Sequence, residues 1–221
     1  EAMEKIDAVI FDMDGVLIDS EPIYMHHVLS FYERFGIHVP YEEVVKLAGS
    51  SNEASWQMMA SWWKEAIDPK ELEQLYETIM QGEEEVVFAD IVNPYVRYIL
   101  PRLRERGIKT AIASSSPMSA IHAMMQQCQL SNSFDLVVTG RDFPFSKPDP
   151  AIYLHTVKQL KVAKEHCIII EDSTYGIEAA IRADIKVAAL KDERFHYDQT
   201  KATYLVHDLL EAYHLILEGE D

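Results

Sequence analysis

The sequence predicts an α/β fold: a Rossmann-like parallel sheet core with helices on both faces, plus a small all-helical cap domain inserted after the first strand. Three observations predict it. Apolar runs of strand length alternate with segments of helical periodicity through the second half of the chain, which is typical of βαβ units. The strand at residues 168–170 is apolar at every position, as expected of a parallel sheet buried on both faces. Residues 18–86, by contrast, show helical periodicity and no strand pattern.

The core strands are expected at five apolar runs and one shorter run near the end of the chain. The first lies at residues 7–11, and the others lie at residues 109–113, 135–139, 167–170, 186–190 and 204–206. Helices are expected between the later strands, for example at residues 118–127 and 151–160. Right-handed crossovers would place these helices on the faces of the sheet.

Four helices are expected between the first two strands, at residues 22–35, 41–47, 53–64 and 69–85. Pro22 and Pro69 suit a first helical turn, where the missing N–H is not needed. Asp68 is a good N-cap, and Gly36 suits the position that follows a helix. We therefore expect residues 1–17 and 87–221 to form the α/β core and residues 18–86 to form the helical cap.

Composition and charge limit the possible functions. The chain has 221 residues, of which 48% are hydrophobic, enough for a folded core. No apolar run reaches the roughly 18 residues that span a bilayer, and the amino terminus lacks the apolar stretch of a secretory signal. Cys128 and Cys167 are too few for a disulfide framework or a four-thiolate zinc site. The net charge of −17 argues against nucleic acid and anionic membranes as partners. We expect a cytoplasmic protein and, by default, a monomer.

Two aspartates follow directly on the first strand. Asp12 and Asp14 are two positions apart, so their side chains can point to the same side. One carboxylate could then attack phosphorus while the other handles a proton. A calcium loop of the EF-hand type is excluded, because it needs glycine at its sixth position and glutamate at its twelfth, where Leu17 and Ile23 stand.

A second acidic pair, Glu171 and Asp172, follows the apolar strand at residues 167–170. Two adjacent acids at such a place are costly unless they meet a cation, and their oxygen atoms suit Mg²⁺. The alternative is a solvated helix start with Asp172 or Ser173 as its N-cap.

Ser114 and Lys147 add groups that suit phosphate. The Ser114 hydroxyl and the backbone N–H groups after it could hold a phosphoryl oxygen, although a turn or a helix cap explains this serine as well. Lys147 lies in a proline-flanked loop and could neutralise charge on the nucleophile and the phosphoryl group. Because ligands of open parallel sheets bind at the carboxyl ends of the strands, all these groups should meet in one crevice. The sequence therefore predicts a site for a metal ion and a phosphate.

With these motifs in this order, the chain resembles the haloacid dehalogenase superfamily, in its branch of β-phosphoglucomutase-like proteins and sugar-phosphate phosphatases with a helical cap. The resemblance covers essentially the whole chain. It implies that Asp12 is the nucleophile, which becomes an aspartyl-phosphate, and that Asp14 is the acid and base. It also implies Mg²⁺ held by the Asp12 carboxylate, the Asp14 backbone carbonyl and Asp172, with Glu171 binding directly or through water. The phosphate-binding residues that it implies are Ser114, Ser115 and Lys147.

The cap distinguishes a phosphatase from a phosphomutase. A phosphomutase needs a second phosphate anchor, and mutases of the family supply an arginine and a lysine in the first cap loop. Here Ala48 and Asn52 stand where those cations would be expected, and Tyr24 replaces a usual histidine. We therefore expect a phosphatase of a small phosphorylated metabolite, with candidate substrate-recognition residues Glu21, Tyr24, Ser50, Ser51 and Asn52.

Two other functions stay open. One is a β-phosphoglucomutase-type phosphomutase, and the other is a non-catalytic regulator that binds a phosphorylated ligand. Such a regulator is expected to lack the nucleophile or a metal-binding acid, and the sequence retains both.

Overall fold

A computed structural model describes residues 3–82 and 86–220 of the chain. By its internal contacts the chain forms two compact units, described separately below. The core unit comprises Glu1–Asp19 and Val87–Asp221, and the helical unit comprises Ser20–Val86.

The core unit is built on a six-stranded sheet in the order β3-β2-β1-β4-β5-β6. All five strand pairings are parallel. The strands are β1 (Ala8–Phe11), β2 (Lys109–Ser114), β3 (Leu136–Thr139), β4 (Cys167–Glu171), β5 (Lys186–Leu190) and β6 (Tyr204–Val206). The predicted α/β class with a parallel sheet is confirmed, and each predicted strand is present to within one residue at either end.

The central strands are buried on both faces, as their continuous apolar pattern predicts. In the register of the sheet, Ile10 of β1 lies between Ala111 of β2 and Ile169 of β4. All three side chains are inaccessible to solvent. The order reverses at β1, because the chain adds β2 and β3 on one side of it and β4 to β6 on the other. Such a reversal places a ligand crevice at the carboxyl ends of the adjoining strands.

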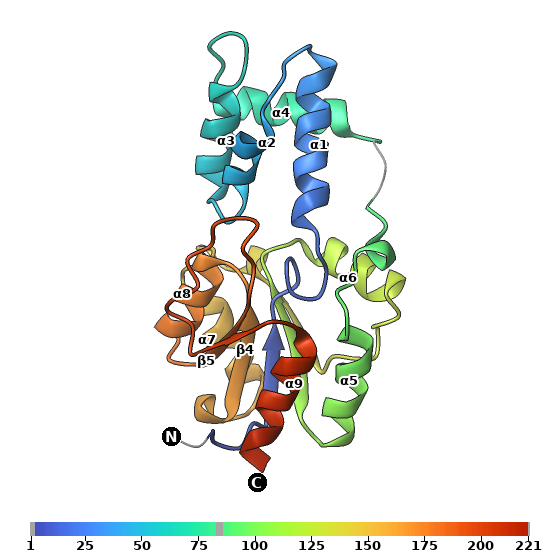
Figure 1. The fold of residues 1–221 in the computed structure, drawn as a ribbon, viewed down its shortest axis with the longest axis vertical. Coiled ribbons are helices and arrows are strands. Elements are labelled where there is room, and N and C mark those ends of the chain that lie inside the picture. Colours follow the sequence, from blue (N-terminus) through green and yellow to red (C-terminus); the bar gives the residue numbers. More distant parts are fainter. Residues whose placement is uncertain (1–2, 83–85, 221) are drawn as a thin grey trace. The chain divides into compact units, whose positions relative to one another are not determined.

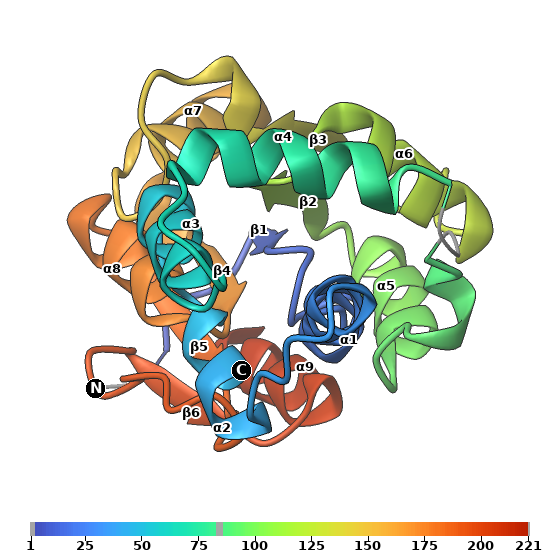
Figure 2. The same ribbon diagram turned by 90° about the horizontal axis from the view of Figure 1, so that it is seen from above.

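Helices cover both faces of this sheet, as Figure 2 shows from above. Helices α7 (Ala151–Leu160) and α8 (Thr174–Arg182) lie on one face, and α5 (Val96–Glu105), α6 (Met118–Gln127) and α9 (Leu209–Leu217) lie on the other. A buried apolar cluster joins α7 and α8 to the sheet through residues such as Tyr153, Ile177 and Ile169. Short 3₁₀ turns of the core unit are η2 (Phe88–Asp90), η3 (Gly140–Asp142), η4 (Lys164–His166) and η5 (Glu218–Glu220).

The segments by which the chain leaves and re-enters the core unit are hydrogen-bonded to each other. The Asp19 N–H donates to the Ile91 carbonyl at 2.7 Å, and the Asn93 N–H donates to the Leu17 carbonyl at 2.8 Å. The Asn93 side chain also donates to the Val16 carbonyl at 2.7 Å. Both connections are thereby fixed at the surface of the core.

The helical unit contains α1 (Glu21–Arg34), α2 (Tyr41–Val44), η1 (Val45–Leu47), α3 (Asn52–Ser61) and α4 (Pro69–Met80) (Figure 1). Aromatic rings form its centre: the Phe31 ring stacks on Trp63 at 5.8 Å and contacts Tyr76 at 5.0 Å. Pro69 lies in the first turn of α4, and the Asp68 side chain caps it, as predicted.

Two predicted helix ends in this unit are wrong, and a third helix keeps its predicted bounds but changes type. The helix predicted to end at residue 64 ends at Ser61, because the chain turns there and places Trp63 against the Phe31 ring. The helix predicted over residues 41–47 tightens to a 3₁₀ turn from Val45. The helix predicted over residues 69–85 ends at Met80, and residues 83–85 of that prediction lie outside the described residues.

Among the described residues, no helix combines the length and apolar character that a membrane crossing requires.

Candidate active site

The site lies where three strands of the core, β1, β2 and β4, end. Asp12 directly follows β1, and Ser114 is the last residue of β2. Glu171 is the last residue of β4, and Asp172 follows it. All four side chains are buried. The parallel sheet therefore brings these sequence-predicted residues together, as their positions at strand ends suggest.

Lys147 connects the acids of different strands. Its ammonium Nζ lies 3.1 Å from Asp12 Oδ1 and 2.6 Å from Glu171 Oε1, and it donates to the Ala113 carbonyl at 3.2 Å. The ammonium comes from the loop before α7 and is almost fully buried. A buried cation bonded to two carboxylates and a carbonyl has its three donors satisfied.

Glu171 is the most enclosed of the acids, with no solvent exposure. Its Oε1 accepts from Lys147 and from the hydroxyl of Tyr153, which comes from α7. Its Oε2 accepts from the Asp172 N–H at 3.2 Å. The carboxylate also rests against Gly176 of α8, where an added Cβ would lie 2.1 Å from Oε2.

Asp172 is held in the same way by a glycine. Gly15, in the turn after β1, has a φ of 84°, and a Cβ on it would lie 1.9 Å from Asp172 Oδ2. Only glycine lets this turn approach the carboxylate so closely. Asp172 itself does not cap α8, since the Ser173 side chain accepts from the Gly176 N–H.

Burial and neighbouring charges shift the pKa values of Asp12 and Lys147. Burial raises the pKa of the Asp12 carboxyl well above its usual range, and the Glu171 carboxylate raises it further against the opposing effect of Lys147. Burial alone would lower the pKa of Lys147, but the Asp12 and Glu171 carboxylates outweigh burial and raise it well above its usual range. The ammonium therefore stays charged, while Lys147 offsets only part of the burial and repulsion that raise the pKa of Asp12.

Asp12, Glu171 and Asp172 fit a divalent metal ion. Each offers a carboxylate oxygen, and the three oxygens lie within 4.8 Å of one another. Three carboxylates beside one ammonium leave two negative charges in excess, which one dication would neutralise. An all-oxygen donor set suits a hard cation such as Mg²⁺. The Asp14 carboxylate does not belong to this group of three.

Asp14, two residues after Asp12, is partly exposed. Its Oδ2 accepts a hydrogen bond of 2.7 Å from the Ser116 hydroxyl. Ser116 is placed by its neighbours, because its N–H donates to Ser114 Oγ and its carbonyl accepts from the Thr139 hydroxyl. The turn after β2 thus orients the predicted acid and base.

The serine turn differs in one respect from the sequence-based expectation. Helix α6 begins at Met118, so Ser114 is neither a helix cap nor the start of a helix. Ser115 is exposed, and its carbonyl accepts from Arg141 at 3.1 Å. The backbone N–H groups near Ser114 therefore belong to a turn stabilised by β3 and the loop after it.

The predicted cap residues all lie in the helical unit. Glu21 and Tyr24 lie in the first turns of α1, and Asn52 is the first residue of α3. Ser51 caps α3 by accepting from the Ala54 N–H at 3.1 Å. Ser50 Oγ donates to the Leu47 carbonyl at 2.8 Å and is also bonded to Ser55. Both serines thus have a structural role in their own loop.

Sequence reasoning missed Tyr153, Ser116 and the two glycines as site residues. Tyr153 lies mid-helix in an apolar pattern, which predicts a core residue, and its ring does lie in the core. Ser116 belongs to a run of three serines after the second predicted strand, and this run is the feature of the sequence that could have indicated it as a site residue.

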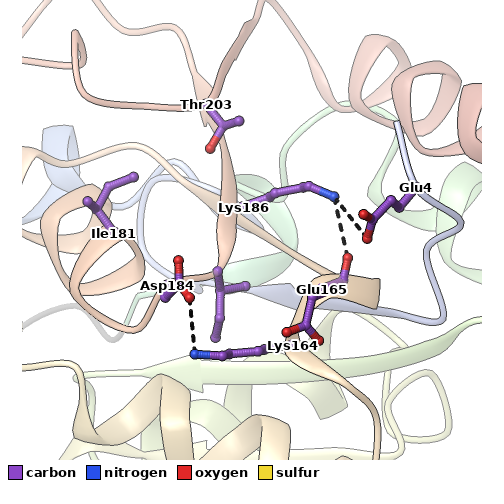
Figure 3. A pocket seen from close by; sticks show the side chains of 8 residues that line it. Glu4, Lys164, Glu165, Ile181, Asp184, Lys186 and Thr203 are labelled. Carbon is purple, nitrogen blue, oxygen red and sulfur yellow. Dashed lines mark hydrogen bonds and ion pairs between the residues drawn. The ribbon is translucent and has the colours of Figure 1, made fainter. Parts of the chain in front are cut away.

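A pocket of about 310 Å³ lies elsewhere in the core unit (Figure 3). Its lining includes Lys186, the first residue of β5. The pocket therefore lies at the amino ends of the strands, whereas the cluster described above lies at their carboxyl ends. Its two lysines face carboxylates: Lys164 lies 3.2 Å from Asp184, and Lys186 lies 3.8 Å from Glu4. Both lysines of this pocket are thus paired with carboxylates of its own wall.

Comparison with known proteins gives the family of the chain. The sequence profile described as "Haloacid dehalogenase-like hydrolase" matches residues 9–190. The chain belongs to this family. The phosphorylated carbohydrates phosphatase of Thermotoga maritima is 33% identical over 185 residues, which cover 82% of this chain and 83% of that protein. Hexitol phosphatase B of Escherichia coli K12 is 28% identical over 186 residues, covering 82% of each chain.

Solved structures agree with the fold. The crystal structure of β-phosphoglucomutase from Clostridium difficile matches with a TM-score of 0.69 and 22% identity, covering 95% of this chain and 97% of that one. The predicted membership of the haloacid dehalogenase superfamily, in its branch of phosphatases and β-phosphoglucomutase-like proteins, is confirmed. So is the prediction of a phosphoric monoester hydrolase of the haloacid dehalogenase type.

Proposed function

We propose that this haloacid dehalogenase-like hydrolase is a Mg²⁺-dependent phosphatase of a small phosphate monoester, such as a sugar phosphate, acting through an aspartyl-phosphate. The observation that carries the proposal is the buried cluster of Asp12, Glu171 and Asp172 around the Lys147 ammonium. The relatives named as phosphatases of phosphorylated carbohydrates and of hexitol phosphates support the substrate class.

In the first step, an Asp12 carboxylate oxygen forms a bond to the phosphorus atom and the ester P–O bond breaks. The leaving oxygen takes a proton from Asp14, so that the product is a neutral alcohol. In the second step, Asp14 takes a proton from water. The oxygen of this water attacks phosphorus, which releases inorganic phosphate and restores the Asp12 carboxylate. The Ser116 hydroxyl on Asp14 Oδ2 would keep this acid and base in one orientation through both steps.

The phosphoryl group needs positive charge and hydrogen-bond donors. Lys147 already contacts Asp12 Oδ1 and so lies beside the attacking atom, where it can stabilise the charge of the transferring group. Ser114 and Ser115 are the proposed hydroxyl and backbone donors. Mg²⁺ held by Asp12, Asp172 and the Asp14 carbonyl, with Glu171 directly or through water, would supply Lewis-acid stabilisation of the same charge.

The helical unit favours a phosphatase over a phosphomutase. A second phosphate anchor would need cations in the loop between η1 and α3 and at the start of α3, where the chain carries Ala48 and Asn52. Losing one charge-assisted hydrogen bond costs about 1.5–3 kcal/mol, so losing two would weaken such an anchor severely. Glu21, Tyr24, Ser50, Ser51 and Asn52 remain the proposed substrate-recognition residues, with the phosphomutase as the alternative function.

A non-catalytic phosphate-binding regulator is the remaining alternative. It would not need a buried lysine bonded to Asp12 or an acid and base oriented by Ser116. We further propose a small phosphorylated metabolite as the sole partner and a monomer in the cytoplasm, the setting that two free, buried cysteines suit.

The test is phosphate release from a panel of sugar, hexitol, nucleotide and short-chain phosphate monoesters, with and without EDTA. β-Glucose 1-phosphate with a bisphosphate primer is included in the panel. We expect Mg²⁺-dependent release from one compound class. Conversion of β-glucose 1-phosphate to glucose 6-phosphate without release would show a phosphomutase instead, and binding without turnover would show a regulator.

A further inference from the structure

Tyr153 brings the only neutral side-chain donor to the Glu171 carboxylate among the described residues. It lies on α7, its side chain is fully buried, and its hydroxyl donates to Glu171 Oε1. Its ring also lies under Lys147, with Nζ 4.9 Å from the ring centroid. The tyrosine thus contacts both members of the Lys147–Glu171 ion pair.

The donors around Glu171 can be counted against its acceptor sites. A carboxylate offers about four lone-pair directions, two on each oxygen. Lys147 and Tyr153 occupy both on Oε1, and the Asp172 N–H occupies one on Oε2. One direction on Oε2 is left for a metal ion or a metal-bound water.

The carboxylate has little freedom to choose another arrangement. Gly176 closes one side of it, since a Cβ there would overlap all of its carboxyl atoms at 2.1–2.3 Å. Which oxygen meets the metal therefore depends on which oxygen the protein donors occupy.

Tyr153 also affects Lys147. The ammonium is shared between Glu171 at 2.6 Å and Asp12 at 3.1 Å. If the hydroxyl were removed, Glu171 Oε1 would depend on Lys147 alone and would hold it more strongly, at the expense of the contact to Asp12. A second donor on Glu171 leaves Lys147 free to serve the nucleophile.

We propose that Tyr153 is a positioning residue of the metal site: it fixes Glu171 with Oε1 turned to Lys147 and Oε2 turned to the metal ion. The inference rests on the proposed Mg²⁺-dependent function and adds to it a residue that touches neither substrate nor metal. Outer hydrogen-bond partners of metal ligands typically change metal affinity by about 10–100-fold when removed.

The test is Mn²⁺ binding to Tyr153→Phe, measured from the electron paramagnetic resonance signal of free Mn²⁺ and therefore independent of turnover. The change removes one oxygen and keeps the ring under Lys147. Tyr32→Phe is the matched control, because Tyr32 is also fully buried and its hydroxyl donates to the Met59 carbonyl in the helical unit. We expect about tenfold weaker Mn²⁺ binding for Tyr153→Phe and unchanged binding for Tyr32→Phe.

A double-mutant cycle with Glu171→Gln shows whether Tyr153 acts through Glu171. We expect Tyr153→Phe to weaken Mn²⁺ binding much less in the Glu171→Gln background than in the native one. Equal affinity of Tyr153→Phe and the native protein would overturn the positioning role and leave the proposed function intact. A native protein that binds no Mn²⁺, and so does not differ from Asp172→Asn, would overturn the metal-dependent function itself.

Discussion

At the scale of one residue, Lys147 is a buried ammonium whose loss of water is compensated by contacts with acceptors. Its ammonium has lost nearly all contact with water and is bonded to two carboxylates and a carbonyl. Breaking such a buried pair by removing one partner is costly, because the other charge remains uncompensated. Lys147 therefore stabilises the acid cluster of the folded protein as well as the charge of the proposed reaction.

Gly176 gives a prediction at this scale. Alanine in a helix is normally better than glycine by about 1 kcal/mol, but a Cβ here would lie 2.1 Å from Glu171 Oε2. We expect Gly176→Ala to lose about 1–3 kcal/mol of unfolding free energy and most of its phosphatase turnover. Urea unfolding and phosphate release measure the two effects.

Gly107→Ala is the control, because it lowers stability through backbone strain at a position where the added Cβ has nothing within 4 Å. Gly107 has a φ of 75° and open space where its Cβ would stand. Alanine there should cost about 1–2 kcal/mol of stability and leave turnover intact. Full turnover of Gly176→Ala would contradict the role of this glycine in placing Glu171.

The principal acids could be predicted because they follow apolar strands, and the carboxyl ends of parallel strands meet at one edge. The same reasoning could not find Tyr153, since its apolar ring satisfies the pattern of a core helix and the pattern says nothing about its hydroxyl. It also could not distinguish Asp172 from Ser173 as the cap of α8. That distinction depends on which side chain reaches the Gly176 N–H, and Ser173 does.

At the scale of elements, the loop between β5 and β6 connects the site to the point where the chain leaves the core. The Gln199 side chain donates to the Asp172 carbonyl at 2.7 Å and accepts from the Asp192 N–H at 3.2 Å. Arg194 then bonds both Asp192 and Asp19, the last residue of the core before the helical unit. A continuous set of hydrogen bonds therefore runs from Asp172, a proposed metal ligand, to this connection.

Arg194→Ala tests whether this network holds the connection in place. Its guanidinium contacts both oxygens of Asp19 at 2.9 Å, a paired geometry that is stronger than a single contact. We expect about 1 kcal/mol lower stability and faster hydrogen exchange of the Asp19 N–H, which is bonded to the Ile91 carbonyl.

Arg182→Ala is the matched control. Arg182 is equally half-exposed and pairs with Glu178 one turn earlier on α8. Such a pair contributes about 0.3–0.5 kcal/mol, and its loss should leave exchange at Asp19 unchanged. Equal effects of the two variants on that amide would show that Arg194 is an ordinary surface pair.

Element boundaries were predictable where one local signal dominates. Asp68 and Pro69 begin α4 because a cap and a first-turn proline act within three residues. The end of α3 depends instead on packing within the helical unit, where the aromatic ring of Trp63 lies against Phe31 and Phe35. Those ring contacts span about thirty residues of sequence and leave no local pattern.

At the scale of the whole molecule, the net charge and the proposed substrate have the same sign. A formal charge of −17 repels a phosphate monoester at long range. Binding then depends on local cations, which in the proposed site are Lys147 and the metal ion. In the proposed aspartyl-phosphate route, Lys147 and the metal ion both act at Asp12. A substitution of Asp12 therefore tests the proposed function most directly.

The most direct measurement is acid-quench detection of protein-bound phosphate by intact mass, with the monoester that turns over fastest in the panel. Asp14→Asn can neither protonate the leaving oxygen nor activate water, so this variant is given 4-nitrophenyl phosphate, whose leaving group departs without a proton. We then expect Asp14→Asn to accumulate one phosphoryl group per chain, and Asp12→Asn to acquire none and to lose turnover. Retained turnover in Asp12→Asn, or a phosphoryl group on that variant, would contradict covalent catalysis by Asp12.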